Sequence, residues 1–206
     1  MAAARDDVIV LDPQKRERRK QILDAAKHVF AEAGYHGASI NAIIERAEIA
    51  RGTFYLYFES KSAVFSSILD QAMADLRTRM HRIQVDDPKA PPPQVQLRAQ
   101  VVAALEYVVQ DRPLAMLLLS AGHTPDAEAA ERLDQFFGEV RDLLRRAFES
   151  GQEIKLLRKV DPDLAAAAML GMIRGVVEML VNRPDSPPVD SVVDELLLVA
   201  LRGVLA

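Results

Sequence analysis

The segment Arg51–Phe58, RGTFYLYF, carries the side chains whose types and spacing point most clearly to a chemistry. Phe54 and Phe58 lie four residues apart and can pack inward on one helical face. The residues left to face outward are Arg51, Gly52, Thr53 and Tyr55. A guanidinium fork can donate to guanine O6 and N7, and the methyl and hydroxyl of a threonine suit a thymine methyl or a phosphate. Because glycine also permits close backbone approach, this segment has the chemistry of a surface that reads a DNA duplex.

The residues before it predict a short helix and a turn, which together make a helix-turn-helix over residues 39–58. Ile40, Ile43, Ile44 and Ala47 recur at the spacing of one helical face. Ser39 stands where an N-cap belongs. Further hydroxyl, amide and ammonium groups on the motif can donate to phosphates. The complete set of predicted DNA-binding residues is Ser39, Asn41, Arg51, Gly52, Thr53, Tyr55, Tyr57 and Lys61.

The string Ala47–Lys61, AEIARGTFYLYFESK, resembles the DNA-binding motif of the TetR-type bacterial transcriptional regulators, Ala-Gly-Val-Ser-Lys-Gly-Thr-Leu-Tyr-x-Tyr-Phe-x-Ser-Lys. The segment Gly34–Ser39 is similar to that family's link between its first and second helices. The match covers only the N-terminal third of the chain. The resemblance implies an all-α homodimer with a three-helix DNA-binding domain at residues 1–61. It also implies a helical ligand-binding and dimerisation domain at residues 62–206.

Two residues depart from the family pattern. Glu48 replaces the usual turn glycine, and a non-glycine residue in left-handed backbone costs roughly 1–2 kcal/mol. Ala50 replaces the usual serine cap, a loss of typically about 1 kcal/mol. Neither residue is a predicted DNA contact, so both bear on turn geometry and local stability and not on binding.

Composition limits the remaining possibilities. The chain has 206 residues, half of them hydrophobic, which suits one large or two small domains with a real core. It has no cysteine, which excludes disulfides, thiolate nucleophiles and cysteine-ligated zinc. The N-terminal residues show no secretory signal, and the apolar runs are shorter than the roughly 20 residues of a membrane span. We therefore expect a soluble cytoplasmic protein without a membrane partner.

The net charge of −4 argues, taken alone, against a nucleic-acid partner. Its distribution argues less strongly, because a basic cluster precedes the first helical apolar face. The cluster consists of Lys15, Arg16, Arg18, Arg19 and Lys20. It can neutralise several phosphates or reach a minor groove, or it can be a solvated helix end.

Helical periodicity runs through the rest of the chain, and no strand pattern is found. The expected helices cover residues 13–33, 63–82, 95–110, 113–121, 127–150, 162–182 and 189–205. A proline-rich stretch at residues 86–93 is expected to be a loop between two of them. Gly34 and Gly151 are expected to end the first and fifth helices.

The last two helices carry features of a dimer interface. Gly171 and Gly175 lie four residues apart, and small residues at that spacing let two helices approach closely. The segment from Val192 to Val204 has more apolar surface than one neighbour would cover. These faces resemble the family's four-helix dimer interface, although they can also complete a monomeric core. In a dimer, two recognition helices about 34 Å apart would read half-sites one turn apart, which implies a near-palindromic operator.

The resemblance also implies a cavity for a small hydrophobic ligand. The predicted ligand-binding residues are Arg98, Tyr107, Met116, His123, Phe137, Met172 and Arg174. Phe136, Met169, Met179 and Glu106 are further candidates, although Met and aromatic residues at helical spacing are more often core. The segment Ser120–Glu128 resembles fatty-acid-metabolism regulators that sense acyl-coenzyme A. A hydrophobic drug would suit the same residue types, which would make the protein a regulator of efflux or stress genes.

Two other classes of protein were weighed. The sequence has no Gly-x-Ser-x-Gly elbow, phosphate-binding glycine loop or His-Glu-x-x-His pair, so no catalytic residue, metal ligand or cofactor is predicted. An all-α interaction module without a DNA role would make Arg51, Thr53 and Tyr55 interchangeable. The preferred reading is a repressor that occludes operator DNA and is released by a small apolar ligand.

Overall fold

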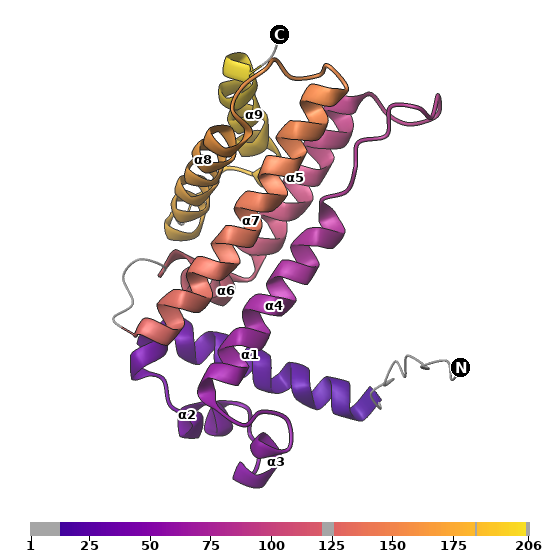
Figure 1. Ribbon diagram of the computed structural model, residues 1–206. Coiled ribbons are helices and arrows are strands. Elements are labelled where there is room, and N and C mark those ends of the chain that lie inside the picture. The colour runs from indigo at the N-terminus through magenta and orange to yellow at the C-terminus, as the bar shows by residue number, and fades with distance from the viewer. Residues whose placement is uncertain (1–12, 121–125, 184, 205–206) are drawn as a thin grey trace, which may run out of the picture.

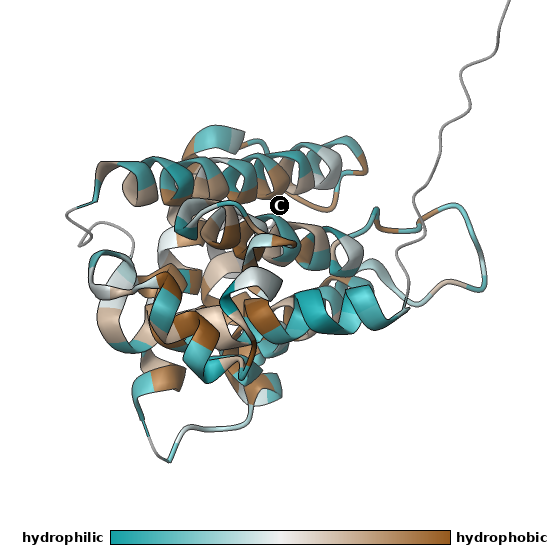
Figure 2. Ribbon diagram, turned by 90° about the horizontal axis from the view of Figure 1, so that it is seen from below, coloured by the Kyte–Doolittle hydropathy of each residue, from teal (hydrophilic) through white to brown (hydrophobic). Residues whose placement is uncertain are grey.

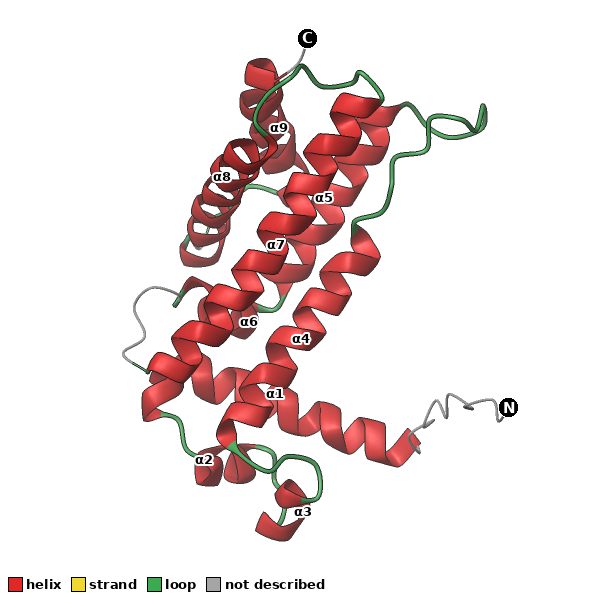
Figure 3. Cartoon of the chain, viewed as in Figure 1, coloured by secondary structure: helices red, strands yellow, loops and turns green. Residues whose placement is uncertain are grey.

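The computed structural model describes residues 13–120, 126–183 and 185–204, and these residues form nine helices and no strand (Figures 1 and 3). The helices are α1 (Pro13–Gly37), α2 (Ile40–Arg46), α3 (Arg51–Tyr55), α4 (Lys61–Arg79), α5 (Pro93–Gln110), α6 (Arg112–Leu119), α7 (Ala127–Glu153), α8 (Pro162–Asn182) and α9 (Val189–Val204). The all-α prediction is confirmed. We call α1–α3 the head and α4–α9 the body, following the predicted boundary after residue 61, which stays a prediction.

The head closes around a small aromatic core. Ile22, Ile43 and Phe54 have 0% of their surface exposed, because the apolar faces of α1, α2 and α3 converge on one another. Near its C-terminal end α1 kinks at Gly34, whose φ of 67° lies in the left-handed region that favours glycine. The predicted helix end at Gly34 is thus a break in regular geometry, after which the helix continues to Gly37.

Helix α4 joins the head to the body. At its start Ser60 caps the helix by accepting a hydrogen bond from Ala63 N at 3.0 Å. Phe65 then packs edge-on against Phe30 and Tyr35 of α1, with ring centroids 5.3 and 4.8 Å apart. One apolar core therefore runs from the head through α4 into α6 and α7.

The body packs α5 against α9 and α7 against α8, with α6 lying between the head and the rest (Figure 1). Its second core lies between α5, α6, α8 and α9 and includes Leu105, Ala115, Val177 and Val193. The proline-rich stretch is a loop as predicted, since α4 ends at Arg79 and α5 begins at Pro93.

The predicted end of α7 at Gly151 is wrong. The helix continues to Glu153, and the left-handed residue that follows it is Lys155, with a φ of 57°. Gly151 is buried, and a Cβ atom there would lie 2.7 Å from Leu157 Cδ1. The glycine therefore makes room for a side chain of the next loop and does not stop the helix.

Helices α8 and α9 leave apolar surface uncovered. Leu164 on α8 is 70% exposed and Val199 on α9 is 66% exposed. On α8, Ala168, Gly171 and Gly175 are also exposed at helical spacing. By length and composition α8 is apolar enough to cross a membrane, and 22% of its most apolar window is buried. The same apolar composition is found in helices that pack against another helix in a protein interface.

Candidate DNA-binding surface and ligand cavity

The turn of the helix-turn-helix has a non-glycine residue in left-handed backbone. Glu48 has a φ of 51°, so a glutamate does occupy left-handed backbone between α2 and α3. Ala50 is the N-cap of α3 and makes no side-chain capping bond, whereas Ser39 Oγ caps α2 by accepting from Ala42 N at 3.1 Å. The turn is held instead from α1, because Gln21 Nε2 donates to Ala47 O at 2.6 Å.

A compact polar group lies on the outer face of α2 and α3. Arg51 Nη1 donates to Asn41 Oδ1 at 3.2 Å, which links the two helices at the surface. The Arg51 guanidinium also lies 5.8 Å from the ring centre of Tyr55, and that tyrosine is 46% exposed. Open space surrounds Gly52, and Thr53 is half-buried. The structure thus brings four predicted contact residues, Asn41, Arg51, Gly52 and Tyr55, to one exposed face.

Three other predicted contacts, Lys61, Tyr57 and Ser39, make bonds or packing contacts within the protein. Lys61 Nζ donates to the backbone oxygens of Tyr35 and Ala38 at 2.7 and 3.2 Å and lies 4.2 Å from the Tyr35 ring centre. Tyr57 is half-buried against the head core. Ser39 is exposed but engaged in its cap. These three residues keep the role of DNA contacts only as a prediction, and the structure adds a local bond or packing role to each.

The basic cluster forms the first turns of α1. Lys15, Arg16, Arg18 and Lys20 are exposed, and this end of the helix is hydrophilic in Figure 2. Arg19 is half-buried, with its guanidinium 5.2 Å from the ring centre of Phe58, which follows α3. One residue of the cluster therefore contacts the segment that follows α3.

A second site lies inside the body, where a cavity of about 560 Å³ opens between α4, α5, α6, α7, α8 and α9. Its walls are largely apolar and include Met80, Leu97, Val140, Leu144 and Ile173. Among the described residues, three arginines also line it, Arg82, Arg146 and Arg174, together with one acid, Glu153. The charge around this apolar space is therefore mainly positive.

The predicted ligand residues fall in several places. Phe137 and Arg174 line the cavity, with the guanidinium 4.7 Å from the ring centre, and Phe136 and Met169 line it as well. Met116 and Met172 do not line it, and His123 lies outside the described residues. Arg98 is on the surface, where Nε donates to Asp194 Oδ1 of α9 at 2.6 Å and holds the pKa of that carboxyl below its usual range.

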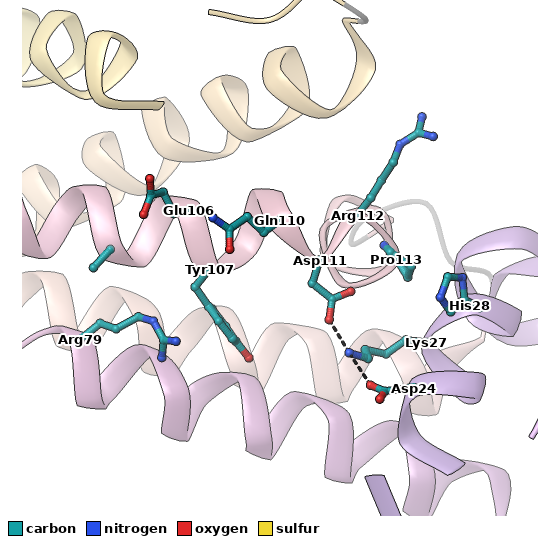
Figure 4. Close-up of a pocket in the computed structure, with 11 residues that line it drawn as sticks. Asp24, Lys27, His28, Arg79, Glu106, Tyr107, Gln110, Asp111, Arg112 and Pro113 are labelled. Atoms are coloured by element: carbon teal, nitrogen blue, oxygen red, sulfur yellow. Dashed lines mark hydrogen bonds and ion pairs between the residues drawn. The ribbon is translucent and has the colours of Figure 1, made fainter. Parts of the chain in front are cut away.

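Tyr107 lines a different, polar pocket of about 810 Å³ where α1 of the head meets α5 and α6 (Figure 4). Glu106 lines this pocket too. Tyr107 donates to Asp75 Oδ2 at 3.0 Å, and burial together with the Asp75 charge raises its pKa. Neither residue lies in the apolar cavity, so the structure separates two groups of side chains that the sequence predicted together.

An ion pair crosses from the head to the body at the same pocket. Lys27 of α1 contacts Asp111, the residue that caps α6, and also Asp24 at 3.0 Å (Figure 4). Burial opposes the charged form of Lys27, but hydrogen bonds and charge attraction from the two aspartates outweigh it and raise its pKa. The amine therefore stays protonated at neutral pH and holds the two parts together.

Sequence reasoning missed several cavity residues, of which Gln100 is the most informative. It lies on α5, is 5% exposed and lines the cavity. The signal was present, since a single glutamine stands among Leu97, Val101 and Ala104 on an otherwise apolar helical face.

Comparison with known proteins identifies one matching family model in the N-terminal part of the chain and another in the C-terminal part. The family model "Bacterial regulatory proteins, tetR family" matches residues 22–68, and "Tetracyclin repressor-like, C-terminal domain" matches residues 90–178. The repressor KstR of Mycobacterium tuberculosis is 30% identical over 139 residues, 67% of this chain and 61% of that protein. The fatty acid metabolism regulator protein of Bacillus subtilis is 42% identical over 67 residues, 32% of this chain and 34% of that protein. The matched regions thus span less than two thirds of these curated relatives.

A solved structure extends the likeness to nearly the whole chain. The fatty acid degradation regulator FadR of Bacillus halodurans superposes with a TM-score of 0.74 at 25% identity, covering 90% of this chain and 95% of that one. The likeness therefore includes both the head and the body. With its helix-turn-helix and both family matches, the chain belongs to the TetR family of DNA-binding transcriptional regulators, which are not enzymes.

Proposed function

We propose that this regulator is a homodimeric repressor that binds a near-palindromic operator through Asn41, Arg51, Gly52, Thr53 and Tyr55. The observation that carries the proposal is the exposed Arg51–Asn41–Tyr55 group, mounted on a helix whose inner residue, Phe54, is fully buried. The buried Phe54 side chain fixes the position of the helix that carries Arg51. Base recognition needs such a fixed position, because a displaced guanidinium would lose one of its two hydrogen bonds to the base. Repression follows if the dimer occludes a promoter.

The uncovered faces of α8 and α9 support the dimer. Exposed Ala168, Gly171 and Gly175 offer a narrow surface for close helix approach, and Leu164 and Val199 add apolar area. A second copy of the chain would cover both helices at once in a symmetric contact. Such a dimer acts on DNA, so we place it in the cytoplasm.

The cavity supports a ligand with an apolar chain and an anionic end. A volume of about 560 Å³ lies within the usual range for small-molecule sites, and its apolar walls suit a hydrocarbon chain. Arg82 and Arg146 line the cavity and are also exposed to solvent, so they can contact a charged group of the ligand that extends out of the cavity. A fatty acid or an acyl-CoA has this shape and charge, and two of the relatives are named as fatty-acid regulators.

The alternative ligand is a neutral hydrophobic drug, which would make the protein a regulator of efflux genes. The apolar walls alone would accept it, but the excess of three arginines over one acid favours the anionic class. An acyl-CoA that releases the protein from DNA more effectively than a neutral compound of equal chain length would decide for the first class.

The experiment that tests the proposal measures binding of the purified protein to DNA upstream of its own gene and to an unrelated duplex, across salt concentrations. We expect sequence-dependent binding with a steep salt slope. Replacing both Arg51 and Tyr55 by alanine should weaken operator binding by roughly 100-fold or more, since one good base contact is worth about 1–3 kcal/mol. Both residues are exposed, so the variant should stay folded and dimeric. Unchanged operator affinity in that variant would remove the proposed recognition surface.

A further inference from the structure

Gln100 is the most deeply buried polar side chain among the described residues that line the cavity. It is 5% exposed, and it projects from α5 between apolar neighbours that line the same space. A buried amide is normally fully hydrogen-bonded, because each unpaired donor costs roughly 1–3 kcal/mol. Gln100 is satisfied only in part.

The amide has a fixed orientation. Gln100 Oε1 accepts from the backbone N–H of His81 at 3.2 Å. A backbone nitrogen can only donate, so the oxygen of the side chain must face His81 and the two end groups of the amide cannot be exchanged. The NH2 group is therefore turned away from His81, and its nitrogen has no hydrogen-bond partner in the described part of the chain.

No other polar group of the cavity hydrogen-bonds to this nitrogen in the described part of the chain, including Ser150 and Glu153, which carry acceptor oxygens. The three arginines that line the space carry donors only, as Gln100 Nε2 does. An apolar ligand that brings one acceptor oxygen would satisfy the amide and leave the hydrocarbon against Leu97, Val101 and Ala104. A pure hydrocarbon would leave the donor unpaired.

We propose that Gln100 is a specificity-determining residue that donates a hydrogen bond to a carbonyl oxygen of an apolar ligand. The inference rests on the proposed function, in which this cavity is the ligand site. The class of ligand is thereby narrowed to hydrocarbon chains that carry a ketone, ester or thioester carbonyl. The same amide holds His81, two residues beyond the end of α4, so the recognised oxygen lies next to the helix that leads to the head.

The test compares 2-undecanone with undecane, two probes of equal chain length of which only the ketone has an acceptor oxygen. Each is titrated into the full-length protein to displace the fluorescent dye 1-anilinonaphthalene-8-sulfonate. We expect the ketone to bind about tenfold more tightly than the alkane, the effect of one hydrogen bond to a buried donor. In Gln100→Leu the preference for the ketone should be lost, because its carbonyl oxygen would be buried without a donor and the ketone would bind more weakly.

Gln94→Leu is the matched control, because it makes the same chemical change at an exposed position of α5 that does not line the cavity. It should keep the tenfold ratio. Gln100→Met, with an unbranched side chain of similar length, guards against misfolding of the leucine variant and should also remove the ratio.

The outcomes separate the inference from the proposed function. Equal binding of both probes to the natural protein, or a ratio that survives Gln100→Leu and Gln100→Met, overturns the role of Gln100 and leaves the cavity as a ligand site. Displacement of the dye by neither probe overturns both.

Discussion

The head and the body use apolar residues in opposite ways. In the head, Ile22, Ile43 and Phe54 leave no exposed surface, and ring contacts link Phe30 and Tyr35 to Phe65 in the first turns of α4. In the body, six helices surround a space of about 560 Å³ that their side chains do not fill. Under the proposed function, tight packing lets the head present a fixed group of polar side chains to DNA, whereas the unfilled space lets the body admit a ligand.

The comparison predicts that equal truncations have unequal effects. Phe54→Ala should lower the free energy of unfolding by about 3–5 kcal/mol, because it opens a hole in a closed core. Phe137→Ala removes a half-buried ring that lines an existing cavity and should cost less than about 2 kcal/mol. Urea unfolding of both variants measures the difference. Equal losses would mean that the cavity wall is as tightly packed as the head.

Alkaline pH should weaken the head through Tyr35. Burial, and next the Glu128 charge, raise the pKa of Tyr35 to about 12, whereas a phenol in the unfolded chain ionises near 10. Between these values the folded state retains a proton that the unfolded state has lost, so stability falls as pH rises, by at most about 1.4 kcal/mol per pH unit. Thermal melts from pH 9 to 12 should show a shallower loss for Tyr35→Phe. The slope that remains should include Tyr107 of the body, whose pKa is raised as well.

The contact between the two parts can be weakened on its own. Asp111→Asn keeps an oxygen that can cap α6 but removes the charge that faces Lys27, and it should lower the free energy of unfolding by about 1 kcal/mol. Asp111→Ala should cost about 1 kcal/mol more, since the cap is lost too. Chemical denaturation of the two variants measures both steps. An asparagine variant as damaged as the alanine variant would show that the charge, and not the cap, matters at this residue.

The head can also be strengthened without touching its DNA surface. Ala50→Ser supplies the missing N-cap of α3 and should raise the free energy of unfolding by about 1 kcal/mol. Operator affinity should not change, because residue 50 is not among the proposed contacts. A change in affinity without a change in melting temperature would place residue 50 in the interface with DNA.

The smallest effect is expected at Arg98. Its ion pairs with Asp190 and Asp194 are exposed on the surface of α5 and α9, where such pairs contribute little. Arg98→Ala should leave the melting temperature and the displacement of the dye by 2-undecanone unchanged. Weaker ligand binding in this variant would restore Arg98 as a ligand contact and extend the cavity toward that surface.

Much of the head could be predicted from the sequence because its signals are local. Ser39 caps a helix that begins one residue later, and Phe54 and Phe58 take the same side because they are four residues apart. The motif marks residue 48 as a turn position usually held by glycine, and Glu48 does have left-handed backbone there. The role of Lys61 could not be predicted, because the two carbonyl oxygens that it binds belong to residues 26 and 23 positions away in the chain.

The body shows where local patterns stop. Its helices were expected within a few residues, yet the cavity is lined by residues of six helices and of the loops after α4 and α7. Periodicity does not say which of the inward residues meet across such a space. Phe137 and Met172 are both large apolar residues on predicted amphipathic helices, but only Phe137 lines the cavity. The prediction that Gly151 ends α7 was wrong. The reason for a glycine at this position is the contact with Leu157, which lies six residues further along the chain and packs against Gly151 only in the folded protein.

The exposed apolar face of α8 makes the stability of the proposed dimer depend on the concentration of the protein. With Leu164 70% exposed and Gly171 and Gly175 open, a lone protomer leaves in water the surface that the proposed partner would cover. In the proposed dimer, association adds to the stability of the folded protomer, so the melting temperature should rise with total protein concentration by mass action. A cell with few copies would hold fewer intact dimers than simple proportion suggests, so operator occupancy would rise more steeply than the amount of protein.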